Sequence, residues 1–447
     1  MASMKRHLIT QLETWKNGGD RQPLLLLGAR QVGKTWLMQE FGRTHFSHTA
    51  YVRFDNDPAM RLAFEQDFHI PRLLDAIRIR TGVPVLPQET LIILDEIQEC
   101  PAALTSLKYF CEEFPEYAVI AAGSLLGLED LYGTGFPVGK VERLTLYPMS
   151  FAEFVEALDG VAYAELLAKR DFGMMRTFSD KFEEMLRYYY YIGGMPRVVA
   201  DFVQNRDFNK VRTIQKRLLD DYRADFRKHT AATTARAMGM LWDSIPAQLA
   251  QENKRFIYAE VSRQAGEKVK SARFHEPLAW LQAAGLVCPV KRVRLPELPL
   301  SAYTDEAFKL FFLDVGLLAA MCELPAAALL EQNRMFGQFK GALTEQYVQQ
   351  ELRTHGLTPY YWAGSQGQAE VDFLISVEGR LLPIEAKAER HLQAKSLPRF
   401  CRRYAIKEAI RTSMHPDYAV REMGAPGGEP YTYQLTDIPL YAISCLT

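Results

Sequence analysis

The chain has 447 residues, of which 48% are hydrophobic and 24% are charged, and its formal net charge is −1 at neutral pH. This length exceeds what one hydrophobic core supports, so about three domains are expected, and the ordinary composition excludes a largely disordered or fibrous protein. Because the net charge is close to zero, any contact with nucleic acid has to come from local basic patches.

The sequence predicts a soluble, cytoplasmic protein with no membrane partner. It contains no run of eighteen apolar residues, and its first residues lack the apolar segment of a secretory signal. Its six cysteines include no C-x-x-C pair, so neither a zinc site nor a disulfide framework is indicated, and the thiols are expected to be reduced.

A complete phosphate loop, G-x-x-x-x-G-K-[ST], occupies residues 28–35. It follows the apolar run Leu24–Leu27, a predicted strand, and precedes a helix predicted through Trp36–Phe41. Backbone N–H groups can wrap a phosphate chain only where glycines permit close approach and positive φ. The residues expected to contact ATP are Gly28, Ala29, Arg30, Gln31, Val32, Gly33, Lys34 and Thr35.

Two of these side chains have specific expected roles. Lys34 would reach the β- and γ-phosphates as a catalytic cation, and the Thr35 hydroxyl would hold Mg²⁺ at the N-terminus of the helix.

The segment Thr90–Glu96 is an apolar run that ends in two acids, which is typical of a strand buried on both faces with a charged tip. We expect Asp95 to hold Mg²⁺, directly or through water, and Glu96 to polarise the attacking water. Taken alone, the two acids could equally belong to a solvated turn. The phosphate loop about sixty residues upstream favours the catalytic interpretation.

A third buried strand is predicted at Tyr117–Ala122. It leads to Ser124, which is a candidate sensor of the γ-phosphate and equally a candidate helix N-cap. Tyr51–Asp55 is expected to add a further strand. We therefore predict an α/β P-loop core of the AAA type over residues 1–155.

A helical lid or linker is predicted over residues 156–240, with a turn at Ile192–Pro196, where Gly-Gly is followed by Pro. Upstream of it, Ser150 and Glu153 form a capping-box pattern at the start of a helix. Basic residues concentrate at 210–236; a solvated helix is the default interpretation, and a surface facing nucleic acid is the other.

Residues 241–330 are predicted to form a winged-helix-like domain. Short helices are expected around 259–262 and 274–284, followed by a β-wing that returns through Ala307–Phe312. Such domains bind DNA in some proteins and only pack domains together in others, and the sequence leaves both open.

A second catalytic signature lies in residues 331–447, which we predict to form an α/β nuclease-like domain of the PD-(D/E)xK type. Strands are expected at 369–375 and 380–387, joined by a turn at Glu378-Gly379. Strand alternation places Glu385 and Lys387 on one face, with Asp372 able to lie beside them.

The spacing D-x(12)-E-x-K is that of two carboxylates that hold Mg²⁺ and a lysine that orients or activates water. An amphipathic helix at 341–352 carries Glu345, the expected additional acid and metal ligand. The alternative is a strand pair decorated with charges, and such a fold need not cleave DNA.

The motifs together resemble one family. The loop G-A-R-Q-V-G-K-T, the strand L-D-E-I-Q, the segment Y-P-M-S-F-A-E-F, the turn G-G-M-P and the pair E-V-D-F…E-A-K are similar to prokaryotic AAA-type ATPases with a C-terminal domain of unknown function. This resemblance implies an ATPase core, a winged-helix-like middle and a nuclease-like end. Many relatives have Arg where this chain has Lys140, so an arginine-finger role there does not carry over.

The expected function is therefore an ATP-binding and ATP-hydrolysing enzyme, with Mg²⁺, coupled to a nuclease-like module that acts on DNA. The alternative is a nucleotide-controlled switch whose C-terminal domain only binds a partner. The sequence is also compatible with a homo-oligomer.

Overall fold

The structure, a computed structural model, describes residues 4–123, 137–158, 160–251, 254–266, 270–330, 337–364, 369–389, 396–427 and 430–446. Two compact units are present, one made chiefly of residues 6–147 and one made chiefly of residues 148–447, and we call them the N-terminal and C-terminal units. No helix among the described residues is long and apolar enough to cross a membrane. All six cysteines are free thiols.

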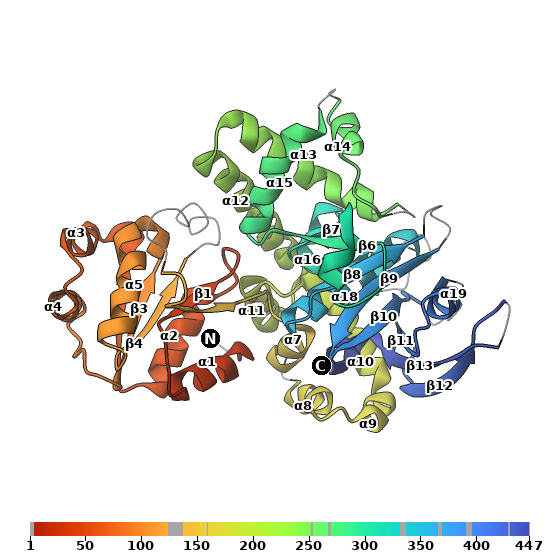
Figure 1. Cartoon of the computed structure of the whole chain (residues 1–447), viewed down its shortest axis with the longest axis horizontal. Helices are drawn as coiled ribbons and strands as arrows, with labels where there is room; N and C mark the ends of the chain where they lie inside the picture. The colour runs from red at the N-terminus through yellow and green to blue at the C-terminus, as the bar shows by residue number, and fades with distance from the viewer. Residues whose placement is uncertain are drawn as a thin grey trace. The chain divides into compact units, whose positions relative to one another are not determined.

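The N-terminal unit alternates strands and helices (Figure 1). Its elements are α1 Leu8–Asn17, β1 Leu24–Leu27, α2 Lys34–His45, β2 His48–Arg53, η1 Phe54–Asn56, α3 Pro58–Gln66, α4 Ile70–Thr81, β3 Thr90–Asp95, η2 Ile97–Glu99, α5 Pro101–Glu113, β4 Ala118–Ala122 and β5 Glu142–Thr145.

These strands form a fully parallel sheet in the order β2-β3-β4-β1-β5. In the register, Leu26 of β1 lies opposite Ala122 of β4, which in turn lies opposite Asp95 of β3. Because parallel strands end at the same edge of a sheet, the loops that follow β1 and β3 lie on the same edge.

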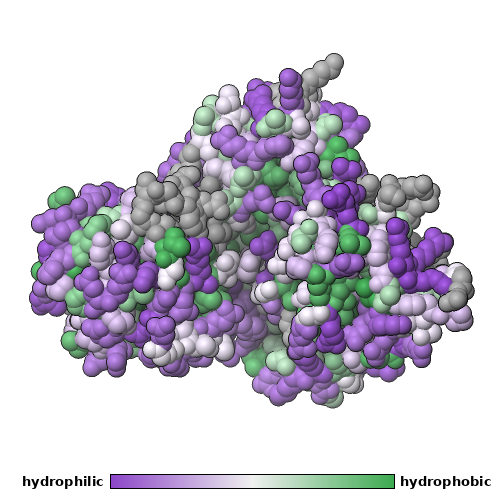
Figure 2. All heavy atoms as spheres, viewed as in Figure 1, coloured by the Kyte–Doolittle hydropathy of each residue, from purple (hydrophilic) through white to green (hydrophobic). Residues whose placement is uncertain are grey.

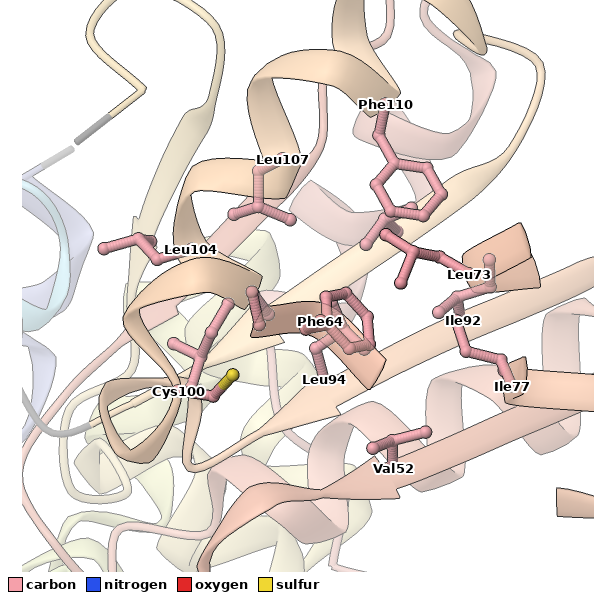
Figure 3. Packing of buried hydrophobic residues seen from close by; sticks show 14 of the residues in the cluster. Val52, Phe64, Leu73, Ile77, Ile92, Leu94, Cys100, Leu104, Leu107 and Phe110 are labelled. Carbon is pink, nitrogen blue, oxygen red and sulfur yellow. The ribbon is translucent and has the colours of Figure 1, made fainter. Parts of the chain in front are cut away.

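Both faces of this sheet are buried, as its continuous apolar strands require. On one face, alternate residues such as Val52, Ile92 and Leu94 pack against Phe64, Leu73, Leu107 and Phe110 of the helices α3, α4 and α5 (Figure 3). Helix α2 contacts β2, β3 and β4, and its buried residues are absent from that cluster, so it covers the opposite face.

The helices of the C-terminal unit precede, interrupt and cover its sheet (Figure 1). They are α7 Phe151–Ala157, α8 Val161–Lys169, α9 Phe172–Thr177, α10 Ser179–Ile192, α11 Pro196–Asn205, α12 Phe208–His229, α13 Ala232–Leu249, α14 Tyr258–Gln264, η3 Ser271–Phe274, α15 His275–Ala283, η4 Leu300–Tyr303, α16 Val315–Met321, α17 Ala326–Leu330, α18 Gly337–Thr354, α19 Ser396–Arg403 and η6 Leu440–Leu446.

The sheet of this unit is mixed, with the strand order β12-β13-β11-β10-β9-β8-β6-β7. Its strands are β6 Val287–Val293, β7 Thr304–Phe312, β8 Tyr360–Ala363, β9 Glu370–Val377, β10 Arg380–Ala386, β11 Glu408–Ser413, β12 Ala419–Gly424 and β13 Thr432–Pro439. Helix α18 contacts β7 and β10, and α19 contacts β9 and β11.

Local sequence signals explain several of the boundaries. The capping box at the start of α7 is present, with the Glu153 N–H donating to Ser150 Oγ and the Ser150 N–H donating to the Glu153 carboxylate. Helix α10 ends at Ile192 and α11 begins at Pro196, so the turn predicted between them is confirmed. The hairpin of β9 and β10 turns at Glu378 and Gly379, both with positive φ, as predicted.

The middle of the chain differs from the expected independent winged helix. Strands β6 and β7 do form an antiparallel hairpin, but β6 also pairs with β8, so the hairpin is an edge of the same sheet as the C-terminal strands. The sheet thus continues across residue 330, and the division of the chain into domains at residues 155, 240 and 330 remains a prediction.

Hydrophilic residues cover most of the face shown in Figure 2, as is usual for solvated surfaces.

Candidate functional sites

The phosphate loop joins β1 to α2 with the backbone geometry that phosphate binding requires. Gly28 has φ 149° and Gly33 has φ 98°, both outside the range that side chains tolerate. A Cβ atom at Gly28 would lie 2.4 Å from the carbonyl oxygen of Leu146, so only glycine fits there. Gln31 also has positive φ, at 65°. Ala29 and Val32, which belong to the loop, are buried.

Lys34, the first residue of α2, folds back over the loop. Its Nζ donates to the carbonyl oxygens of Gly28 and Ala29 at 2.8 and 2.9 Å. Burial lowers the pKa of Lys34 to about 8, against the opposing effect of the Glu96 and Asp95 carboxylates, while the nearby Arg30 lowers it further. The ammonium is thus held where a phosphate chain would neutralise it.

Thr35 and Asp95 meet although sixty residues separate them. The Thr35 hydroxyl donates to Asp95 Oδ2 at 2.7 Å, and the other carboxylate oxygen accepts the Glu96 N–H at 3.0 Å. Two oxygen ligands on adjacent corners of an octahedral Mg²⁺ site are about 3 Å apart, so this pair fits a magnesium ion.

Glu96 lies at the tip of β3 with φ 51°, a left-handed conformation that is uncommon outside glycine. The Gln98 side chain donates to its carboxylate at 2.7 Å and holds it in place. Strained backbone at a charged strand end is typical of functional sites.

Sequence reasoning missed two residues of this site. Tyr51 of β2 donates its hydroxyl to Asp95 Oδ2 at 2.9 Å, and the buried Arg6 donates to the carbonyl oxygen of Val32 at 2.8 Å. The position of Tyr51 in a strand neighbouring β3 could have indicated the first contact; no local signal marks Arg6. The candidate sensor Ser124 lies outside the described residues.

Two of the three acids predicted in the C-terminal unit, Glu345 and Asp372, come together with a third that was not predicted, Glu370. Carboxylate oxygens of Glu345, Glu370 and Asp372 all lie within 4.8 Å of one another. In the antiparallel register of β9 and β10, Phe373 lies opposite Ile384, so the next step places Asp372 opposite Glu385. The Ala386 N–H donates to Asp372 Oδ2 at 2.8 Å.

Lysines occupy the space between these acids. Lys309 of β7, fully buried, pairs with Glu345 at 3.0 Å and with Glu370 at 2.5 Å. Lys254 pairs with Glu345 at 2.5 Å, and Lys387 pairs with Glu385 at 2.5 Å. We call Lys254, Lys309, Glu345, Glu370, Asp372, Glu385 and Lys387 the acid–lysine cluster.

The charges in this cluster are strongly coupled. Burial, then the Glu385 and Glu345 carboxylates, raise the pKa of Asp372 well above its usual value. Burial also raises the pKa of Glu385. Burial acts in the same direction on Glu345, but Lys309 and Lys254 outweigh it and lower its pKa to about 2.

The cluster therefore balances its charges without a metal. Four carboxyl groups face three ammonium groups, and the raised pKa of Asp372 favours its neutral form. The three converging carboxylates have the ligand type and spacing of a metal site, but Lys309 is bonded to Glu345 and Glu370, so a divalent cation would compete with its ammonium for their oxygens. Sequence reasoning missed Lys309, Lys254 and Glu370. The charged Lys309 within the apolar strand Ala307–Phe312 was the available signal, since a buried ammonium requires acidic partners.

Comparisons with known proteins agree with the architecture of the N-terminal unit. Residues 20–155 match a family described as an AAA domain. Residues 183–328 and 340–424 match two domains of unknown function, DUF8612 and DUF4143. No curated protein matches the chain in sequence.

Solved structures with a similar arrangement have low identity to this chain. A Walker-type ATPase of Pyrococcus abyssi has 15% identity and a TM-score of 0.46, covering 72% of this chain and 96% of its own. The ORC2 protein of Aeropyrum pernix, in ADPNP and ADP complexes, has 14% identity and a TM-score of 0.37, covering 76% and 94%. At these TM-scores the similarities carry no argument about function. The match over residues 20–155, together with the parallel sheet and the phosphate loop, identifies the N-terminal unit as an AAA-type P-loop nucleotide-binding core.

Proposed function

We propose that this protein binds and hydrolyses ATP with Mg²⁺ at the phosphate loop. The observation that carries the proposal is the 2.7 Å contact between Thr35 and Asp95, which unites the two nucleotide-site motifs at the edge of the sheet where Lys34 lies. Chance charges at a strand end would not supply a hydroxyl and a carboxylate at the spacing of adjacent magnesium ligands.

Each residue of the site has a defined part in this reaction. Lys34 and the loop N–H groups bind the phosphates, and Thr35 and Asp95 would hold Mg²⁺, which neutralises charge on the phosphate oxygens. Glu96, fixed by its bond to Gln98, orients the attacking water.

The test compares three variants for ATP binding and for phosphate release. Lys34→Ala should abolish tight ATP binding, and Glu96→Gln should keep binding but lose hydrolysis, because only Lys34 contacts phosphate in the ground state. Glu99→Gln is the matched control, since Glu99 is exposed on the adjacent turn η2. Equal hydrolysis rates for the wild type and Glu96→Gln would refute the role of Glu96.

We further propose that the ATPase is coupled to a nuclease-like function of the acid–lysine cluster, acting on DNA. The convergence of Glu345, Glu370 and Asp372 within 4.8 Å supports it, together with Lys387 two residues after Glu385. Self-association of the AAA-type core belongs to the same proposal and would be measured by light scattering with and without ATP.

A second candidate for the C-terminal unit is a partner-binding module under nucleotide control. The ion pairs of Lys309 with Glu345 and Glu370 favour it, since an internal lysine there supplies the positive charge that a metal would bring.

Cleavage of labelled single- and double-stranded DNA with Mg²⁺ or Mn²⁺, with and without ATP, separates the two. The nuclease-like function predicts metal-dependent cleavage that Asp372→Ala abolishes while ATP hydrolysis is retained, because the two sites lie in separate cores. Glu378→Gln, at the exposed turn of the β9–β10 hairpin, is the control. No cleavage by the wild type, and no binding of Mn²⁺ to its C-terminal unit, would favour the partner-binding module.

A further inference from the structure

A cavity of about 770 Å³ opens between helices α12, α13 and α14 of the C-terminal unit. The three helices are drawn in yellow-green and green in Figure 1. This cavity is separate from the phosphate loop and from the acid–lysine cluster, and neither proposed function uses it. Its volume is in the range of pockets that enclose an organic ligand.

Three arginines line the cavity from two helices. Arg223 and Arg227 lie four residues apart on α12, on the same side of the helix, and Arg236 lies on α13. Among the lining residues that the structure describes, Asp243 is the one acid, and it pairs with Arg223 at 2.5 Å. Within the part of the chain that the structure describes, Arg227 has no acidic residue at ion-pair distance. Three guanidinium groups and one carboxylate thus lie among the described lining residues, and the planar fork of a guanidinium group matches phosphate.

The rest of the lining is mostly apolar. Phe226, Met240 and Val261 contribute to the wall, together with alanines of α13. Apart from the charged side chains, Gln264 is the one polar side chain in the described part of the lining. A pocket for one particular metabolite normally presents several neutral hydrogen-bonding groups as well. Cationic side chains beside an apolar wall instead suit a single strand whose phosphates contact the cations and whose bases pack against the wall without sequence-specific hydrogen bonds.

We propose that this cavity binds single-stranded nucleic acid without sequence preference. Arg227 contacts a phosphate, and a base enters against the half-buried Met240. A base can do so only when it is unpaired, so a duplex is excluded. For the C-terminal end of the basic segment 210–236, the proposal adopts the second of the two interpretations of the sequence, a surface facing nucleic acid.

Gly239 allows this proposal to be tested with one position. It lines the cavity from α13, and a Cβ atom added there would meet no atom within 4 Å. Gly239→Trp should fill the cavity without disturbing the helix, whereas Gly239→Ala should leave it open. The full chain carrying Lys34→Ala is used throughout, so that nucleotide binding at the phosphate loop does not contribute.

The measurement is the fluorescence anisotropy of a labelled oligothymidine of about 20 nucleotides, titrated with protein at several salt concentrations. Gly239→Trp should weaken binding by roughly tenfold or more, and Gly239→Ala by less than about twofold. Arg227→Gln should lower the slope of log affinity against log salt by about 0.7, the value for one phosphate contact on a single strand. Arg217→Gln, exposed on the same helix but outside the cavity, should leave the slope unchanged.

Three outcomes would overturn the proposal. Binding that Gly239→Trp does not weaken would place the strand elsewhere. Equal affinity for the duplex of the same length would exclude an inserted base. Displacement of the strand by free thymidine monophosphate at micromolar concentration would identify a nucleotide pocket instead. Asp243→Asn should instead make binding tighter, because it removes the negative charge that pairs with Arg223 in the lining.

Discussion

The pKa of Lys34 leads to a quantitative prediction about ATP affinity. The side chain titrates near pH 8 in the nucleotide-free protein, because burial disfavours the ammonium. A bound polyphosphate favours the ammonium and raises this pKa, so above pH 8 the protein must take up a proton in order to bind ATP. The affinity should therefore fall about tenfold per pH unit once the pH exceeds 8.

The magnitude follows from the protonated fraction of Lys34. With a pKa of about 8, about nine-tenths of the side chain is protonated at about pH 7 and about 3% at about pH 9.5, so the dissociation constant should rise roughly 30-fold. Calorimetric titration with a non-hydrolysable ATP analogue and Mg²⁺ measures this, and titrations in two buffers give the proton uptake directly.

Lys34→Arg is the control, since a guanidinium stays charged over this pH range. Its affinity should be nearly independent of pH, even if it is weaker throughout. A wild-type dissociation constant that changes by less than about threefold between these pH values, or an equal pH dependence in Lys34→Arg, would refute the assignment of the titrating group.

Two further predictions concern the stability of the C-terminal unit. The Glu351 carboxylate is buried, accepts the Phe151 N–H at 2.8 Å through one oxygen and leaves the other without a partner; burial raises its pKa from 4.5 to about 7. Since the folded pKa is the higher one, its contribution to the free energy of unfolding is complete below about pH 4.5 and is lost as the pH rises through 7. The free energy of unfolding of Glu351→Gln, measured in urea and taken relative to the wild type, should therefore rise by about 3 kcal/mol between about pH 4.5 and pH 8. A difference between the two proteins that does not change with pH would contradict this. Gly316→Ala should lower the free energy of unfolding by about 2–4 kcal/mol, because its Cβ would lie 2.4 Å from backbone atoms of Ile192 and Gly193. Gly239→Ala has open space around the new Cβ and should raise the free energy of unfolding by about 0.5–1 kcal/mol, because alanine favours the helix α13. Equal melting temperatures of these two variants would contradict the destabilisation predicted from the close packing at Gly316.

Local chemistry made the nucleotide site visible in the sequence. The phosphate loop needs glycine at fixed positions, and a buried parallel strand needs a continuous apolar run, so Gly28, Gly33 and the two acids at the end of β3 are marked by residue type and spacing alone. The turns at Ile192–Pro196 and Glu378–Gly379 were predictable for the same reason: a few adjacent residues determine the backbone there.

The strand order and the charge balance of the C-terminal unit depend instead on contacts between distant segments. No local sequence pattern predicts that β6 pairs with β8 and so joins the hairpin of residues 287–312 to the C-terminal sheet. Lys309 lies 36 residues from Glu345 in sequence, yet the two form a buried ion pair that changes what the predicted acidic site can bind. The sequence by itself determined which acids are present and which strands and helix carry them. Only the tertiary structure decided that lysines lie between them, because a buried charge is compensated by whichever opposite charge the fold brings near, however far along the chain it lies.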